Sequence, residues 1–202
     1  MISAATQQVG KPITALSNMR EGILLVLIAW ILLSIGLLAL IASLWLAIIT
    51  TRHIEIAGVA PRVSLLVAAV LAIVGAVVGL VGFYFKFIPG VTELARADSR
   101  FDTARTLIKI GYVWGLILVV IGIPLLLVII GILVLVVGYI LLLLGYIGVI
   151  ILSFKLNDVY PNALYLAAAI LFIISMIVPV VGVVSWILLY VALGDTINKL
   201  RA

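Results

Sequence analysis

Few side chains in this chain have the chemistry of a catalytic or metal site. His53 is the only histidine, and Glu55, two positions later, is a weak second metal ligand. Nothing in the sequence makes Asp158 and Asp195 an acid–base pair. Cysteine is absent, which excludes disulfides and thiol catalysis. The sequence therefore predicts no catalytic residue, no metal ligand set and no cofactor, and we expect the protein not to be an enzyme.

Most of the side chains are apolar and can contribute to packing but not to catalysis. Hydrophobic residues make up 67% of the 202 residues and charged residues 9%, whereas soluble domains are about 45–50% apolar and about 25% charged. A soluble fold of this composition would lack the polar side chains needed to cover its surface. The composition therefore predicts a membrane protein surrounded by the lipid bilayer. The net charge of +5 is spread thinly, so it does not indicate binding to nucleic acid.

Apolar runs along the chain are long enough to cross a membrane, which takes about 20 residues for about 30 Å of hydrocarbon. No charge occurs from Ile110 to Phe154. A single helix of that length would extend about 67 Å, so we expect a turn between Pro124 and Gly131. The sequence predicts an all-α, polytopic membrane helix bundle in one transmembrane domain, residues 1–202, which begins with a polar arm, residues 1–21. The predicted spans are residues 23–49, 63–85, 107–129, 132–154, 163–178 and 181–198.

Pro179 leaves the last apolar run open to a second interpretation. Proline disrupts a helix interior and suits a first turn, so the run is either two spans or one long helix kinked at Pro179, which gives five spans. Six spans place every Lys and Arg except Arg52 and Arg62 on one side of the membrane, the stronger asymmetry under the positive-inside rule. We therefore expect six spans in the cell membrane with both termini cytoplasmic. The final pair is also short enough for a re-entrant hairpin.

The charges gather in ELARADSRFDTARTLIK, residues 93–109. On a helix, apolar residues there would form one stripe at spacings of three and four: Leu94, Ala97, Phe101, Ala104 and Ile108. This pattern predicts an amphipathic connector, residues 91–106, lying in the membrane interface. The candidate contacts for a partner or an anionic lipid are Arg96, Arg100, Phe101 and Arg105. A solvated connector without a partner explains the same charges and is the preferred interpretation.

Glycines recur at helical spacing inside the predicted spans. Small residues on one face let helix backbones approach closely in lipid, so we interpret them as helix-packing positions, either within the chain or between copies. The candidates are Gly75, Gly79, Gly111, Gly115, Gly131, Gly138 and Gly145.

The C-terminal half supports a resemblance. The stretch LLLLGYIGVIILSFKLNDVYPNALYLAAAILFIISMIVPVVGVVSWILLYVALGDTINKL has a glycine-flanked span, a short linker with Asn-Asp and Tyr, an Asn-Ala helix start and a proline-glycine turn. Mainly over residues 94–200, the chain resembles a family of small archaeal multi-pass membrane proteins described only as a domain of unknown function. This resemblance implies an archaeal cell membrane and brings no activity and no functional residues.

Two functions remain open. Glycine faces combined with spans that lack charge favour a structural or accessory protein that packs with itself, as a homo-oligomer, or in a larger membrane complex. The alternative is a small transporter or channel for an uncharged or lipid-like solute. A polar-lined central cavity would favour the alternative, and tight packing throughout would favour the structural role.

Overall fold

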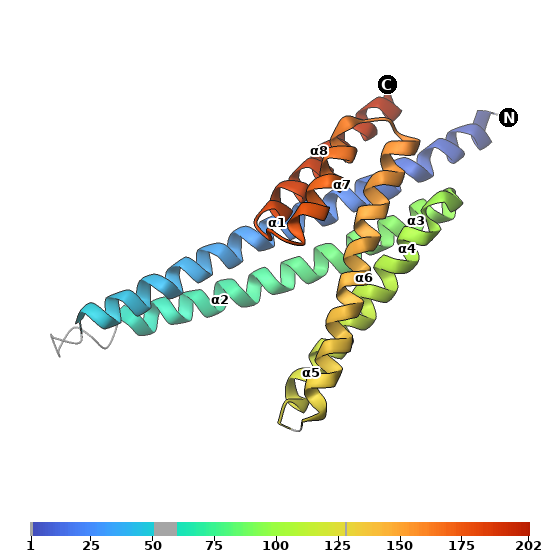
Figure 1. Ribbon diagram of the computed structural model, residues 1–202. Coiled ribbons are helices and arrows are strands. Elements are labelled where there is room, and N and C mark those ends of the chain that lie inside the picture. The colour runs from blue at the N-terminus through green and yellow to red at the C-terminus, as the bar shows by residue number, and fades with distance from the viewer. Residues whose placement is uncertain (1, 51–59, 128) are drawn as a thin grey trace. The chain divides into compact units, whose positions relative to one another are not determined.

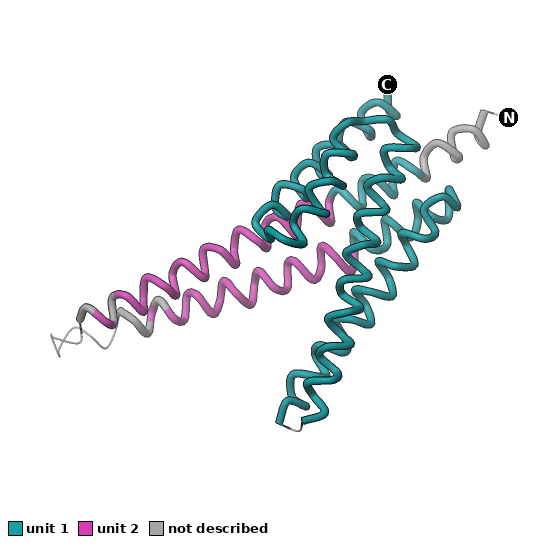
Figure 2. Tube along the Cα trace, in the orientation of Figure 1, with its two compact units in different colours: residues 1–20, 86–202 teal, residues 21–85 magenta. Residues whose placement is uncertain are grey.

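The computed structural model describes residues 2–50, 60–127 and 129–202, and these residues form only helices and turns (Figure 1). The chain divides into two compact units, drawn in different colours in Figure 2. Unit 1 comprises Met1–Arg20 and Lys86–Ala202, and unit 2 comprises Glu21–Phe85. The predicted all-α fold class is confirmed.

Unit 2 is a long helical hairpin. Its first arm is the part of α1 (Ile2–Thr50) that follows Arg20, and its second arm is α2 (Ala60–Leu80) with the start of the π-helix η1 (Val81–Phe87). Large apolar side chains lie exposed along both arms, for example Leu38 and Leu66. A surface of this kind is stable in lipid rather than in water.

Unit 1 contains the remaining helices. They are α3 (Ile88–Ala97), the 3-10 helix η2 (Ser99–Phe101), α4 (Asp102–Ile108), the π-helix η3 (Lys109–Trp114), α5 (Gly115–Leu125), α6 (Ile130–Val159), α7 (Ala163–Ser175) and α8 (Val181–Arg201). The helix α6 is the centre of this unit, because it contacts α4, η3 and α5 as well as α7. The helix α8 packs against α7.

The uncharged run from Ile110 to Phe154 turns back on itself. The helix α5 ends at Leu125, one residue after Pro124, and α6 begins at Ile130, one residue before Gly131. The amide of Leu126 donates to the Ile123 carbonyl at 3.2 Å, a tight turn of the kind that ends helices.

The last apolar run forms two helices rather than one kinked helix. The chain turns between Ser175 and Val181, and the amide of Gly182 donates to the Pro179 carbonyl at 3.0 Å. Pro179 lacks the N–H that would continue α7. Among the described residues, five helical stretches are long and apolar enough to cross a membrane, and α7 is a shorter apolar helix of 13 residues. These are the helices of a membrane protein.

The N-terminal segment, predicted as a polar arm over residues 1–21, is helical and partly buried in its described residues. The described residues before the first span belong to α1, and Ala15, Leu16 and Met19 are completely buried. Their spacing of one and three residues gives a helix a narrow apolar face. A Cβ atom on Gly90 would lie 2.8 Å from the Ala15 carbonyl oxygen, so α3 packs directly on this segment.

The large side chains of unit 1 that are completely buried come from η1, α3, η2, α4, the last part of α6, α7 and α8. They include Phe87, Leu94, Phe101, Ile108, Leu152, Leu156, Tyr165, Phe172 and Leu189. By contrast, side chains near the α5–α6 turn, such as Leu127 and Ile129, are almost fully exposed. Tight side-chain packing is therefore concentrated at the end of unit 1 that also carries its charges.

Candidate functional site

The predicted amphipathic connector, residues 91–106, is not one helix. The helix α3 ends at Ala97, and Asp98 has an extended backbone with φ −146° and ψ 113°. The Asp98 carboxylate accepts a hydrogen bond from the Arg100 amide at 3.0 Å, which caps the following turn. The expectation of a single interfacial helix is therefore wrong, because this capping interaction ends α3 and reverses the chain.

Arg100 and Asp98 form a bidentate ion pair at this turn. The Arg100 Nε atom lies 3.1 Å from Asp98 Oδ1, and Nη2 lies 2.6 Å from Asp98 Oδ2. The side-chain hydrogen bond from Arg100 holds the pKa of Asp98 below its ordinary value. Arg105 pairs more loosely with Asp102, at 3.4 Å.

The other candidate contact residues have different surroundings. Arg96 is exposed and has no ion-pair partner among the described residues. Glu93 accepts a hydrogen bond from Asn18 Nδ2 at 3.2 Å rather than pairing with Arg96. Phe101 is completely buried, so this side chain packs in the core and is not available to a partner.

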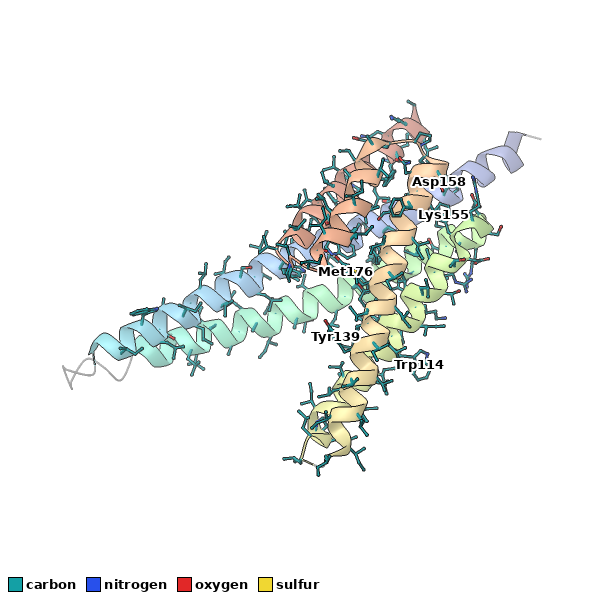
Figure 3. All side chains as sticks on the ribbon, viewed as in Figure 1. Trp114, Tyr139, Lys155, Asp158 and Met176 are labelled. Carbon is teal, nitrogen blue, oxygen red and sulfur yellow. The ribbon has the colours of Figure 1, made fainter. Side chains whose placement is uncertain are left out.

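The turn between α6 and α7 lies beside the Asp98 turn. The negative charge of Asp158 acts on the Arg100 guanidinium, and α6 contacts η2. Lys155 lies 3.7 Å from Asp158, and Figure 3 shows both side chains near the end of α6. Burial, together with the charge of Asp98, raises the pKa of Tyr160 above its ordinary value. Two chain reversals thus form one charged surface.

The N-terminal segment contacts α8 through the side chain of Arg20. The Arg20 guanidinium carbon lies 4.5 Å from the centre of the Tyr190 ring on α8, a cation–π contact. A Cβ atom on Gly194 would lie 3.1 Å from Arg20 Nε, and this buried nitrogen has no hydrogen-bond partner within the described part of the chain. The absence of a side chain at Gly194 therefore makes room for the guanidinium. This pairing has no signature in the sequence, because Arg20 and Tyr190 are far apart in the chain.

We call this end of unit 1 the polar end. It is defined by Asn18, Arg20, Glu93, Arg96, Asp98, Arg100, Lys155, Asp158, Tyr160 and Lys199.

A buried hydrogen bond and edge-to-face ring contacts join the helices of unit 1. Tyr165 Oη lies 2.8 Å from Thr196 Oγ1, and both side chains are buried. The Trp186 ring packs edge-on between Phe172 and Phe87, with ring centres 5.2 and 5.4 Å away. These contacts link α7, α8 and the end of η1.

The glycines predicted in the second span lie against the facing arm of unit 2. A Cβ atom on Gly75 would lie 3.2 Å from the Ala29 carbonyl oxygen, and one on Gly79 would lie 3.1 Å from Ala29 Cβ. Gly82 is tighter, because its Cβ atom would lie 2.8 Å from the Gly22 carbonyl oxygen.

The glycines predicted in the third and fourth spans lie between α6 and its partner arm. A Cβ atom on Gly111 would overlap the Gly145 backbone, and one on Gly131 would overlap the Leu125 backbone. Gly138 faces the Gly115 carbonyl oxygen, which would lie 3.2 Å from an added Cβ. In both units, all seven candidate glycines therefore lie in helix contacts within one chain.

Arg52, His53 and Glu55 lie outside the described residues. Among the described residues, no group of three His, Cys, Asp or Glu side chains could hold a metal ion.

Comparison with known proteins gives a family and no activity. No curated protein and no solved structure matches the chain. A family model matches residues 12–202, nearly the whole sequence, and this range includes both the polar end and the glycine-lined hairpins. The chain therefore belongs to the family described as protein of unknown function (DUF973).

Proposed function

We propose that this protein is a structural or accessory component of a cell membrane, which assembles with a second copy of itself or with another membrane protein. The carrying observation is the direct backbone contact within its apolar hairpins, most clearly between Gly111 and Gly145. Helices packed in this way form stiff rods whose outer faces are left for lipid or for other helices.

The polar end supplies the surface on which a partner is recognised. Arg96 is exposed without an ion-pair partner among the described residues, and Arg100 is held in one orientation by Asp98. A fixed guanidinium loses less side-chain entropy on binding than a mobile one. An acidic segment of a partner protein is the chemistry that this surface complements.

We assign the polar end to the cytoplasmic side. It carries arginines and lysines from several helices, whereas residues 110–154, which lead away from it and return, carry no charge. This distribution is the one that the positive-inside rule describes for a cytoplasmic face. Residues 12–20 lie there beside α8, since Arg20 contacts Tyr190 and Gly194, and Gly194 is about two turns before the end of α8. Both termini are therefore cytoplasmic in this proposal.

Assembly is tested on the full-length protein, purified in lipid nanodiscs and examined by native mass spectrometry. The expected result is a stable oligomer, or a defined complex with another membrane protein. Arg96→Glu should weaken that assembly, whereas Thr106→Ala, an exposed and uncharged position on the same segment, should leave it unchanged. A monomer without partners that carries a neutral solute into proteoliposomes would contradict the proposal and favour a transporter.

A further inference from the structure

Contacts across unit 1 fix the depth of the α7–α8 hairpin relative to Lys109. A Cβ atom on Gly148 would lie 2.8 Å from the Ile108 amide nitrogen, so Lys109 is level with this part of α6. The Tyr146 hydroxyl, two residues earlier, donates to the Phe172 carbonyl at 3.2 Å. Lys109 and Phe172 therefore lie within roughly one or two helical turns of the same level, at about 5.4 Å per turn.

A second set of contacts leads to the same depth independently. Lys86 precedes Phe87, whose ring lies 5.4 Å from that of Trp186. Trp186 in turn lies 5.2 Å from Phe172. Two lysines on different helices thus lie close to the level at which α7 approaches its end.

Lysine side chains near the ends of spans indicate where the hydrocarbon of the membrane begins. An ammonium group in the hydrocarbon is costly, so a lysine near a span end extends its stem until the charge reaches the headgroups. Lys109 is exposed and immediately precedes the long uncharged run. The hydrocarbon on the polar-end side therefore begins close to the level of Lys109 and Lys86.

The two hairpin tips of unit 1 extend very different distances beyond this level. From Lys109 to Leu127, at the α5–α6 turn, the chain advances roughly 27 Å, close to the full hydrocarbon thickness of about 30 Å. From Phe172 to Ile177, at the α7–α8 turn, it advances only about 8 Å. In Figure 3, Met176 lies between the levels of Lys155 and Tyr139 on α6.

The α7–α8 tip is also suited to an apolar environment. Ile177 is 86% exposed and Val180 is 79% exposed, with Met176 beside them. The amides of Met176 and Ile177 donate within the turn at 3.2 and 3.0 Å, and Pro179 has no N–H. Each paired amide lowers the cost of placing this turn in hydrocarbon, where an unpaired backbone group has no water to bond.

We propose that the α7–α8 hairpin is re-entrant: it enters the membrane from the polar-end side, turns about 8 Å inside the hydrocarbon of that leaflet and returns. Its exposed face contacts the acyl chains of that leaflet only. The chain then crosses the membrane through its other four long helical stretches. The C-terminus stays on the polar-end side, because both helices of the hairpin end there.

Single cysteines test this depth directly, because the chain contains no cysteine of its own. Ile177→Cys and Leu127→Cys place a thiol at the two exposed tips, and Ser99→Cys places one in the polar turn. Each full-length variant is placed in nanodiscs, where both membrane faces are open, and treated with a charged maleimide. We expect the thiols at positions 99 and 127 to react. The thiol at position 177 should react at least about tenfold more slowly, because the charged reagent is excluded from hydrocarbon.

A second measurement identifies what covers the tip. A fluorophore attached at position 177 should be quenched most strongly by lipids that carry a spin label near the chain middle, whereas one at position 127 should be quenched by labels near the headgroups. Maleimide reaction at position 177 as fast as at 127 would overturn the proposal. Slow reaction without lipid quenching would also overturn it, because protein rather than acyl chains would then cover the tip.

Discussion

Gly111 and Gly145 bring the backbones of η3 and α6 into direct contact, and a Cβ atom on Gly111 would overlap the Gly145 backbone. We predict that Gly111→Ala lowers the free energy of unfolding by about 1–3 kcal/mol or more, because the backbones must separate. Thermal unfolding in detergent or nanodiscs measures the effect.

Gly182→Ala is the matched control for that substitution. A Cβ atom at this position would make only ordinary contacts, 3.5 Å from Ser175 Cβ. We expect the control to unfold within about 0.5 kcal/mol of the unchanged protein. Equal stability of the Gly111 and Gly182 variants would show that the contact between η3 and α6 does not limit stability.

The buried pair Tyr165 and Thr196 should respond asymmetrically to mutation. The Thr196 hydroxyl donates to the Ala192 carbonyl at 3.0 Å, so Tyr165 must be the donor between the two hydroxyls. Tyr165→Phe removes this donor and leaves Thr196 bonded, at a cost of about 0.5–1.5 kcal/mol. Thr196→Val leaves the Tyr165 hydroxyl buried without its acceptor, at a cost of about 1–3 kcal/mol.

The double variant of Tyr165 and Thr196 completes a thermodynamic cycle. Removing both polar groups should cost less than the sum of the single changes, because no buried donor remains unpaired. Additive losses of unfolding free energy would refute the hydrogen bond as the cause.

Hydrophobic patterning predicted the all-α class well, because a long uncharged run in lipid has only the helix to satisfy its backbone. The break in the run after Ile110 follows from length alone, and Pro124 supplies the local chemistry. The end of α3 was harder to predict. The residues around Asp98 keep a helical apolar spacing through the turn, so periodicity hides a reversal that depends on one carboxylate cap.

The contacts of the polar end could not be predicted from the sequence. Asn18 bonds to Glu93 and Arg20 covers Tyr190, although each pair joins distant parts of the chain and has no signature in either part. The spacing of Ala15, Leu16 and Met19 indicates a buried helix face, but the polar residues between and around them weaken this pattern in the sequence. Glycine spacing indicated close packing without showing which helix is the partner.

The cation–π contact between Arg20 and Tyr190 predicts that the ring matters more than its hydroxyl. Tyr190→Phe keeps an aromatic face under the guanidinium and should change the unfolding free energy little. Tyr190→Leu removes the face and should cost about 0.5–2 kcal/mol. Repeating both substitutions in an Arg20→Gln background should abolish most of the difference, and a difference that persists would assign the effect to packing alone.

The Asp98 cap predicts a pH-dependent turn. Hydrogen bonding to Arg100 lowers the folded-state pKa of Asp98, so its carboxylate stabilises the turn above the ordinary carboxyl pKa. This stabilisation is lost as the pH falls through the lowered value. Hydrogen exchange of the Arg100 amide, which donates to Asp98 Oδ1 at 3.0 Å, should therefore accelerate in acid after correction for intrinsic rates.

Asp98→Asn keeps an oxygen acceptor without a titrating group, so the protection of the Arg100 amide in this variant should not vary with pH. Equal pH dependence in both proteins would show that another group controls the turn.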